Sequence, residues 1–220
     1  MRKGKGYIES LIAEGEHVHQ DFKYQITDAR KIARSISAFA NNSGGHLLVG
    51  VKDNGRIVGV SDEEEIYMIE QAATMYCRPE QHPKCKIYRV DGKNVLKVDI
   101  EEATEKPVKA PDEHGNWKAY YRVADENILA SAVHVKAMTH QNQDATIDDE
   151  VVINYTDNER LLLDYLNSHG GISIDGYIKL AHISRPTAEQ SVINLYRIGV
   201  VELDYLQNGV CLITSTDEQI

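Results

Sequence analysis

The sequence predicts an α+β protein in which a mixed-sheet domain precedes a smaller, mainly helical domain. Over the first 140 residues, apolar residues at helical spacing alternate with short strand-like runs that close on Asn-Gly or Asp-Gly turns. Residues 156–220 instead suggest a helix, a short strand, two further helices and a hairpin. A chain of 220 residues is long enough for one or two domains, so this change of pattern favours two.

An apolar helix, a turn and a buried strand follow one another near the N-terminus. Apolar spacing predicts a helix over residues 28–41, with Thr27 capping its first turn. Asparagine competes for backbone hydrogen bonds and glycine adopts positive φ readily, so this helix should end in the sequence Asn-Asn-Ser-Gly-Gly. The residues assigned to the structural turn are Asn41, Gly44 and Gly45. A strand over 46–52 should follow, with a hairpin at Asn54-Gly55 returning along 57–60.

The remaining elements of the first domain follow from the same rules of periodicity and turn chemistry. In order, they are a helix at 62–76, strands at 84–90 and 94–100, a strand at 118–123 and a closing helix at 127–138. Residues 141–155 have no strong periodicity and suit a linker. We therefore expect a first domain at 1–140 and a second at 156–220.

The second domain is predicted to be a small winged helix-turn-helix. Its third helix should be capped by Ser184, and Pro186 falls in the first turn, where a missing N–H costs little. In a DNA reader of this kind the third helix enters the major groove, so Arg185 is a nucleic-acid-binding candidate. Residues 155–220 carry 4 Lys and Arg against 9 Asp and Glu, however, a net charge of −5. Homodimerisation or contact with another partner is therefore the alternative role for this domain.

Charge is distributed unevenly along the chain. The whole sequence has a net charge of −10, whereas residues 1–60 carry 9 Lys and Arg against 6 Asp and Glu, a balance of +3. Neutralisation of phosphates supplies most non-specific affinity for nucleic acid, so any such binding must be local to the basic N-terminal part. The candidate contacts there are Lys23, Arg30 and Arg34, and the two arginines lie one helical turn apart. The alternative is an ordinary solvated helix face.

The order of six short motifs in the first domain resembles the AlbA_2 domain, which Schlafen proteins share with many bacterial proteins. They are Asp21-Phe22-Lys23, residues 38–45, Gly50-Val51-Lys52-Asp53, Arg78-Pro79, Lys106-Pro107-Val108 and Tyr120-Tyr121-Arg122-Val123. The resemblance covers about residues 7–135. It implies a nucleic-acid-binding protein of the transcriptional-regulator type, with DNA or RNA as its partner, and it adds Arg122 to the nucleic-acid-binding candidates.

The same resemblance implies an enzyme as an alternative. Some Schlafen proteins are endoribonucleases with a cluster of acidic residues, and the resemblance places Glu16, Asp21 and Asp53 at those positions. Three convergent carboxylates can hold Mg²⁺ or Mn²⁺ at a scissile phosphate. On one uninterrupted strand, positions 16 and 21 point to opposite faces, so Glu16 must precede the strand or a bulge must intervene. His17 and His19 would share a face with Asp21, a weaker pattern for a transition metal.

Several other classes of protein are disfavoured by the sequence. It contains no G-x-x-x-x-G-K-[ST] motif for a nucleotide and no G-x-S-x-G motif for a nucleophile. Three cysteines without a CxxC pair argue against a disulfide framework and a zinc ribbon. The stretch over residues 7–13 near the N-terminus is too short and too polar for a signal peptide. We therefore expect a cytoplasmic protein without a cofactor or a membrane partner.

Overall fold

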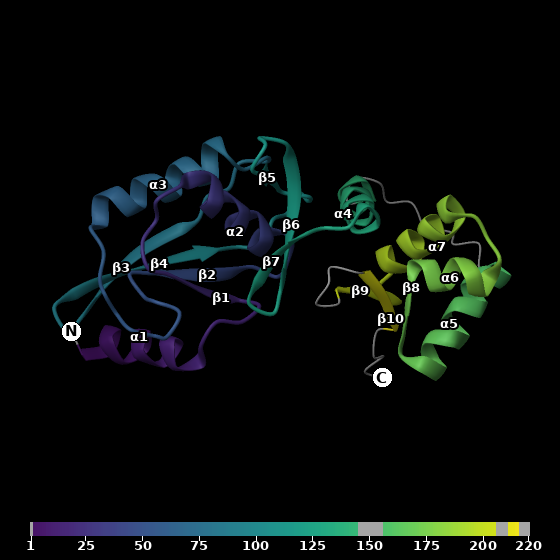
Figure 1. Ribbon diagram of the computed structural model, residues 1–220, viewed down its shortest axis with the longest axis horizontal. Coiled ribbons are helices and arrows are strands. Elements are labelled where there is room, and N and C mark those ends of the chain that lie inside the picture. Colours follow the sequence, from purple (N-terminus) through teal and green to yellow (C-terminus); the bar gives the residue numbers. More distant parts are fainter. Residues whose placement is uncertain (1, 145–155, 206–210, 216–220) are drawn as a thin grey trace. The chain divides into compact units, whose positions relative to one another are not determined.

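The computed structural model describes residues 2–144, 156–205 and 211–215, and its elements are labelled in Figure 1. The chain divides into two compact units, with the boundary between Leu129 and Ala130. This boundary precedes the expected domain end at residue 140, because α4 (Ala132–Asp144) packs against α7 (Arg185–Arg197) within the second unit. Most of the expected linker lies outside the described residues. No helix in the described ranges is long and apolar enough to cross a membrane.

The first unit combines two sheets with three helices, as the predicted α+β class requires. A four-stranded sheet has the order β1 (Gln20–Lys23), β2 (Gly45–Val49), β4 (Lys93–Ile100) and β3 (Lys84–Val90). Strands β1 and β2 are parallel and the other pairs antiparallel. A smaller antiparallel sheet contains β5 (Lys109–Pro111), β6 (Trp117–Val123) and β7 (Glu126–Leu129). Helices α2 (Ala29–Asn41) and α3 (Asp62–Met75) lie on one face of the larger sheet, and α1 (Arg2–Glu14) lies on the other (Figure 1).

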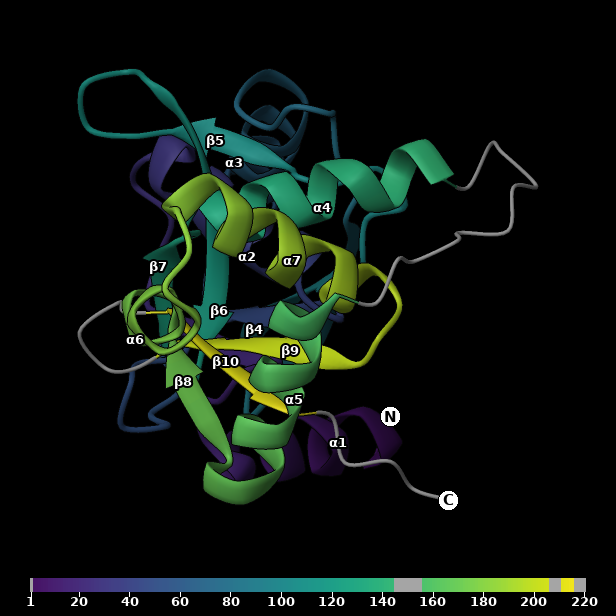
Figure 2. The ribbon, with the colours of Figure 1, turned by 90° about the vertical axis from the view of Figure 1, so that its right-hand side faces the viewer.

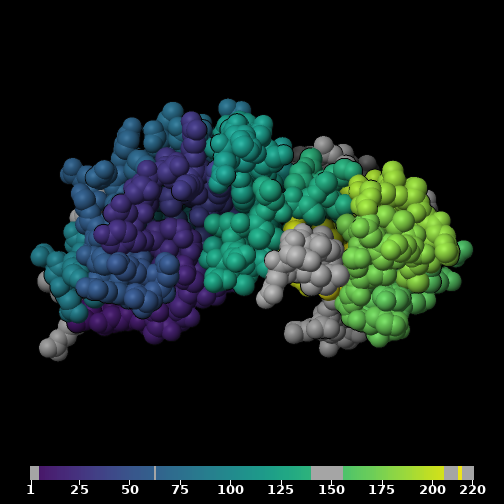
Figure 3. Space-filling model, in the orientation of Figure 1, coloured from purple at the N-terminus to yellow at the C-terminus, as the bar shows by residue number. Residues whose placement is uncertain are grey.

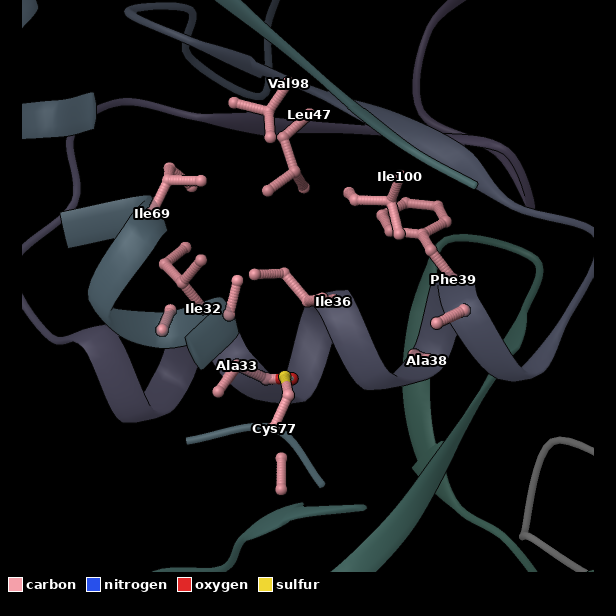
Figure 4. Close-up of a cluster of buried hydrophobic side chains, with 14 of the residues drawn as sticks. Ile32, Ala33, Ile36, Ala38, Phe39, Leu47, Ile69, Cys77, Val98 and Ile100 are labelled. Atoms are coloured by element: carbon pink, nitrogen blue, oxygen red, sulfur yellow. Dashed lines mark hydrogen bonds between the residues drawn. The ribbon is translucent and has the colours of Figure 1, made fainter. Parts of the chain in front are cut away.

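The main hydrophobic core lies between α2 and the four-stranded sheet. Ile36 and Phe39 of α2 are buried completely and face Leu47 and Ile100 of the sheet (Figure 4). Because side chains alternate along a strand, Leu48 points to the other face, where it joins a smaller cluster beneath α1. The four-stranded sheet is therefore apolar on both sides of its centre, and α2 is fixed firmly on one of them.

One expected helix feature of the first unit was wrong, and one helix was not predicted. Asp28, not Thr27, caps α2, since its carboxylate accepts the Arg30 N–H at 2.9 Å. Helix α1 was not expected at all. It is amphipathic, and it buries Ile8 and Leu11 against the sheet. Two glycines and three cations among its first six residues conceal it, because glycine lowers helix propensity.

Two expected strand and helix assignments also need correction. The helix expected at 127–138 is instead strand β7 followed by α4, because residues 126–129 pair with β6 across a tight turn at Ala124 (φ +51°). The tight turn at Asn54-Gly55 is present, yet its return segment forms only an isolated bridge at Ile57. The ladder ends there because the Gly50 carbonyl accepts the N–H groups of both residues 58 and 59.

The second unit contains, after α4, the predicted order of elements. They are α5 (Asp157–His169), β8 (Gly171–Ser173), α6 (Ile174–Ala181), α7, β9 (Val201–Tyr205) and β10 (Cys211–Ser215). The three strands form an antiparallel sheet in the order β8-β10-β9, and Figure 2 shows α4 beside α7. Ser184 caps α7 as expected, accepting the Thr187 N–H. The expected turn at Asn208-Gly209 lies outside the described residues.

The turn after α2 depends on Gly44. Its φ is +76°, and a Cβ there would lie 2.8 Å from the Ile100 carbonyl oxygen and 3.1 Å from the Glu102 nitrogen. The Gly44 N–H donates to the Phe39 carbonyl oxygen at 3.1 Å, which closes the helix end. Both a left-handed backbone and a close approach of neighbouring backbone therefore require glycine at this position.

This close approach predicts different costs for two alanine substitutions. Gly92 also has a positive φ, +80°, but nothing lies within 4 Å of its Cβ position. Gly92→Ala should lower the free energy of unfolding by about 1 kcal/mol, the left-handed strain alone, and Gly44→Ala by roughly 2–3 kcal/mol. Urea denaturation of the two variants measures both values. Equal losses would contradict the steric role of Gly44.

Candidate nucleic-acid interface

Two adjacent asparagines at the end of α2 hold the smaller sheet in place. The Asn41 amide donates to the carbonyl oxygens of Val108 and Tyr120, each at 2.8 Å, and its oxygen accepts the Val108 N–H at 2.7 Å. Asn42 exchanges two hydrogen bonds with the backbone of Arg122, at 3.0 and 3.2 Å. Both asparagines are buried. Their side chains, together with the Ser37 hydroxyl that also donates to the Val108 carbonyl oxygen at 2.8 Å, satisfy backbone groups of β6 and of the residue before β5, and they place β6 beside α2.

Arg122 lies in the interior, although it was a candidate for contact with nucleic acid. Its side chain is 1% exposed, and its Nη2 lies 3.5 Å from the buried Asp21 carboxylate. The guanidinium also donates to the Asn127 side chain at 3.0 Å and to the Gln20 carbonyl oxygen at 3.2 Å. Arg122 therefore ties β6 to β1 and is not at the surface.

Lys23 and Glu16 complete this polar cluster. The Lys23 ammonium lies 2.7 Å from the second Asp21 oxygen, so Asp21 is balanced by two cations. Glu16 precedes β1, as its spacing from Asp21 required, and it accepts the Phe22 N–H at 2.8 Å. Burial, together with a hydrogen bond to Asp21, raises the pKa of Glu16 to about 7. The two carboxyls thus share a partly buried site in which one of them readily holds a proton.

The third candidate carboxylate, Asp53, is exposed in the turn that follows β2. Within the described ranges, no three His, Cys, Asp or Glu side chains are grouped as metal ligands. A divalent ion at Glu16 and Asp21 would have to displace both Lys23 and Arg122, so the residues present do not fit Mg²⁺ or Mn²⁺. His19 is also engaged elsewhere, with its Nδ1 3.1 Å from the Gly44 carbonyl oxygen.

On α2, Arg30 is exposed and Arg34 is half-buried, with 20% of its side chain exposed, and each lies over an aromatic ring. The Arg30 guanidinium is 5.5 Å from the centroid of the Tyr76 ring, and that of Arg34 is 6.0 Å from the Tyr120 ring. Arg34 also donates from Nε to the Pro111 carbonyl oxygen at 2.9 Å. Such contacts limit side-chain motion while leaving the remaining N–H groups available. These arginines are therefore positioned before any ligand arrives.

A third arginine of this kind was not predicted. Arg78 follows α3, and its guanidinium lies 3.9 Å from the centroid of the Trp117 ring on β6. The side chain of Arg78 is exposed and Trp117 is half-buried. Thirty-nine positions separate the two residues, so no local pattern in the sequence relates them. The Arg78-Pro79 motif identified Arg78 as part of the family resemblance but gave no indication that Trp117 lies beside it.

Arg185 of the second unit lies beside two carboxylates. It forms an ion pair with Asp175, and a second pair with Glu189 at 4.0 Å. Its side chain is 56% exposed, so both pairs are weak surface interactions. The start of α7 therefore presents a mixed rather than a basic surface.

The fold agrees with a comparison against protein families. The family model for Schlafen, AlbA_2 matches residues 16–131, more than half of the chain. The chain therefore belongs to the Schlafen AlbA_2 family. No curated protein matches the sequence.

Sixteen chains of solved structures match this chain, among them the following three. DIP2311 from Corynebacterium diphtheriae is 20% identical, with a TM-score of 0.46, and the match covers 97% of this chain but only 44% of that protein. The N-terminal domain of a Nitrosomonas europaea protein described as RecG-related is 24% identical over 60% of this chain and 97% of the domain, with a TM-score of 0.43. Bordetella bronchiseptica BpsR is 19% identical over 38% of this chain and 60% of BpsR, with a TM-score of 0.27. At these values the likenesses establish no function for this chain.

The raised pKa of Glu16 predicts a pH-dependent stability. Between about pH 4.5 and 7 the folded protein holds the Glu16 proton more tightly than the unfolded chain does, so stability is present below this window and falls as the pH rises through it. Glu16→Gln keeps the acceptor for Phe22 and removes the titration. The unfolding free energy of the wild type should fall by on the order of 1–2 kcal/mol relative to this variant between about pH 5 and 7.5. Parallel pH profiles would contradict the shift.

Proposed function

We propose that this chain binds nucleic acid through its first unit, using the arginines on the surface of α2, and that it is a regulator-type protein that binds rather than cleaves. The observation that carries the proposal is that Arg30 and Arg34 lie one helical turn apart, each held over an aromatic ring. Membership of the Schlafen AlbA_2 family supports the same assignment.

The distribution of charge supports the first unit as the binding unit. Residues 1–129 carry 19 Lys and Arg against 21 Asp and Glu, a net charge of −2, whereas residues 130–220 carry 5 against 13, a net charge of −8. Nucleic acid would be repelled by the second unit and nearly unaffected by the net charge of the first. Local placement of arginines therefore decides where binding occurs.

Binding without cleavage is supported by the state of the carboxylates. Asp21 is held by Lys23 and Arg122, and Glu16 accepts a backbone hydrogen bond. In this arrangement the two carboxyls stabilise the fold where β1 meets β6. Lys23 forms an ion pair with Asp21, so it contributes less to phosphate binding than the two α2 arginines.

For the second unit we propose a winged helix that contacts a partner, either a second copy of this chain or another protein. The helix–strand–helix–helix–hairpin order and the β8-β10-β9 sheet support the fold. The pairing of Arg185 with Asp175 and Glu189 favours partner contact over reading of the major groove.

Salt-dependent binding tests the proposed role of α2. The double variant Arg30→Ala/Arg34→Ala should weaken binding to every oligonucleotide and reduce the slope of log K against log salt by about 0.7–0.9 for each phosphate that is no longer neutralised. Fluorescence anisotropy with a labelled oligonucleotide over a salt series gives this slope. Thermal unfolding verifies that the variant is folded, because Arg34 also contacts Pro111.

A matched control removes the same charge elsewhere in the first unit. Lys86→Ala/Arg89→Ala takes two exposed cations from β3, and their removal should leave the slope almost unchanged. Equal reductions by the two double variants would show a diffuse charge effect and contradict an interface on α2.

A further inference from the structure

Three pairs of an exposed or half-buried arginine with an aromatic ring occur on the first unit, and their residues come from α2, β6 and the segment that follows α3. They are Arg30–Tyr76, Arg34–Tyr120 and Arg78–Trp117. In each pair an arginine lies against the face of a ring. A nucleobase can stack on the other flat face of such a guanidinium where that face is accessible, and the exposed Arg30 and Arg78 offer more of it than Arg34, whose side chain is 20% exposed.

Direct contacts connect the pairs into one surface. Arg30 and Arg34 are neighbours on α2, and Arg34 donates to Pro111, which pairs with Trp117 in the β5–β6 ladder. The Arg78 guanidinium lies over the Trp117 ring. Only two positions in the chain separate Arg78 from Tyr76, the partner of Arg30. The three pairs therefore form a closed circuit of neighbours, which we name the arginine track.

The surfaces that carry the track are adjacent. Helix α2 packs against both β5 and β6. In Figure 3 the purple surface that contains α2 borders the teal surface of the β5–β6 segment. The backbones of Arg78 and Lys109 exchange hydrogen bonds at 2.9 and 2.7 Å, so the chain after α3 is fixed to β5. The track is thus anchored by main-chain as well as side-chain contacts.

The carboxylates beside the track leave most of its charge free. Glu113 lies 3.9 Å from Arg34, and its side chain is 81% exposed, so this pair is weak. Asp112 accepts hydrogen bonds from residues 114 and 116 of its own loop. Glu80 is exposed near Arg78 in sequence. Among the described residues, no carboxylate forms an ion pair with Arg30 or Arg78.

We propose that the arginine track binds a single-stranded nucleic acid whose bases stack on the guanidinium planes. This inference rests on the proposed function and specifies its ligand. Only unpaired bases expose their faces, since those of a duplex are stacked on one another.

The charge of the chain also favours a single strand. A protein with a net charge of −10 gains little from phosphate neutralisation alone, which is the main source of non-specific affinity for a duplex. Stacking of a base on an aromatic ring adds a factor of roughly five to a hundred in affinity, arginine adds a cation–π attraction, and both tolerate any sequence. Three neighbouring stacking positions therefore supply affinity that phosphate neutralisation does not supply.

Trp117 makes this proposal directly measurable, because it is the single tryptophan of the chain. The full chain is titrated with a mixed-sequence single strand, as DNA and as RNA, and with the same strand annealed to its complement. The single strand should change Trp117 emission saturably and bind at least about tenfold more tightly than the duplex at equal salt.

Conservative variants separate stacking from charge. Arg78→Lys keeps the positive charge and loses the planar group, so single-strand affinity should fall about tenfold with an unchanged salt slope, while duplex affinity stays the same. Trp117→Leu removes the ring that holds Arg78, so its single-strand affinity, measured by fluorescence anisotropy, should fall by a similar factor. Arg89→Lys makes the same exchange at an exposed arginine on β3 and should have no effect.

The outcomes distinguish this inference from the proposed function. Equal affinity for single strand and duplex, or equal behaviour of Arg78→Lys and Arg89→Lys, would overturn the single-strand track while leaving nucleic-acid binding intact. Displacement of the strand by polyglutamate as readily as by unlabelled strand would indicate an acidic protein partner and overturn it too. Absence of binding to every oligonucleotide at low salt would overturn both.

Discussion

The arrangement of the first unit depends on two asparagine side chains that replace backbone pairing between sheets. Strands β5 and β6 have no ladder to the four-stranded sheet, and Asn41 and Asn42 satisfy their inward groups instead. Each such hydrogen bond contributes only about 1 kcal/mol net, but leaving a buried backbone group without a partner costs about 1–3 kcal/mol. The asparagines thereby determine which residues of β6 meet α2. Tyr120 comes to lie beneath Arg34, and Arg122 reaches Asp21.

Charge in the first unit is separated by depth. Below the surface, the buried Arg122 and the half-buried Lys23 neutralise Asp21, and burial raises the pKa of Glu16 to about 7. Breaking such a buried pair costs several kcal/mol, which favours keeping these groups in a structural role. At the surface, the side chains of Arg30 and Arg78 have only aromatic partners among the described residues. Cations below the surface therefore stabilise the fold, whereas exposed arginines are available to a ligand.

Local signals in the sequence were sufficient for much of the fold. The apolar period predicted α2, the Asp91-Gly92 turn predicted the β3–β4 hairpin, and Ser184 marked the start of α7. Helix α1 and strand β7 were missed because their identity is set by packing: α1 depends on the sheet it covers, and β7 on its pairing with β6. For the same reason, only part of the candidate site could be predicted from the sequence. Basic residues on α2 share one helix face, whereas the burial of Arg122 and the stacking of Arg78 on Trp117 depend on contacts between distant segments.

Amide hydrogen exchange at Val108 tests the role of the asparagines most directly. In the wild type this buried N–H donates to the Asn41 side chain, whereas the Leu48 N–H lies within the four-stranded sheet. In Asn41→Leu, protection at Val108 should fall at least about tenfold more than protection at Leu48, because β5 and β6 open locally from α2. An equal fall at both amides, or no change at Val108, would contradict the dependence of the first unit on its asparagine contacts.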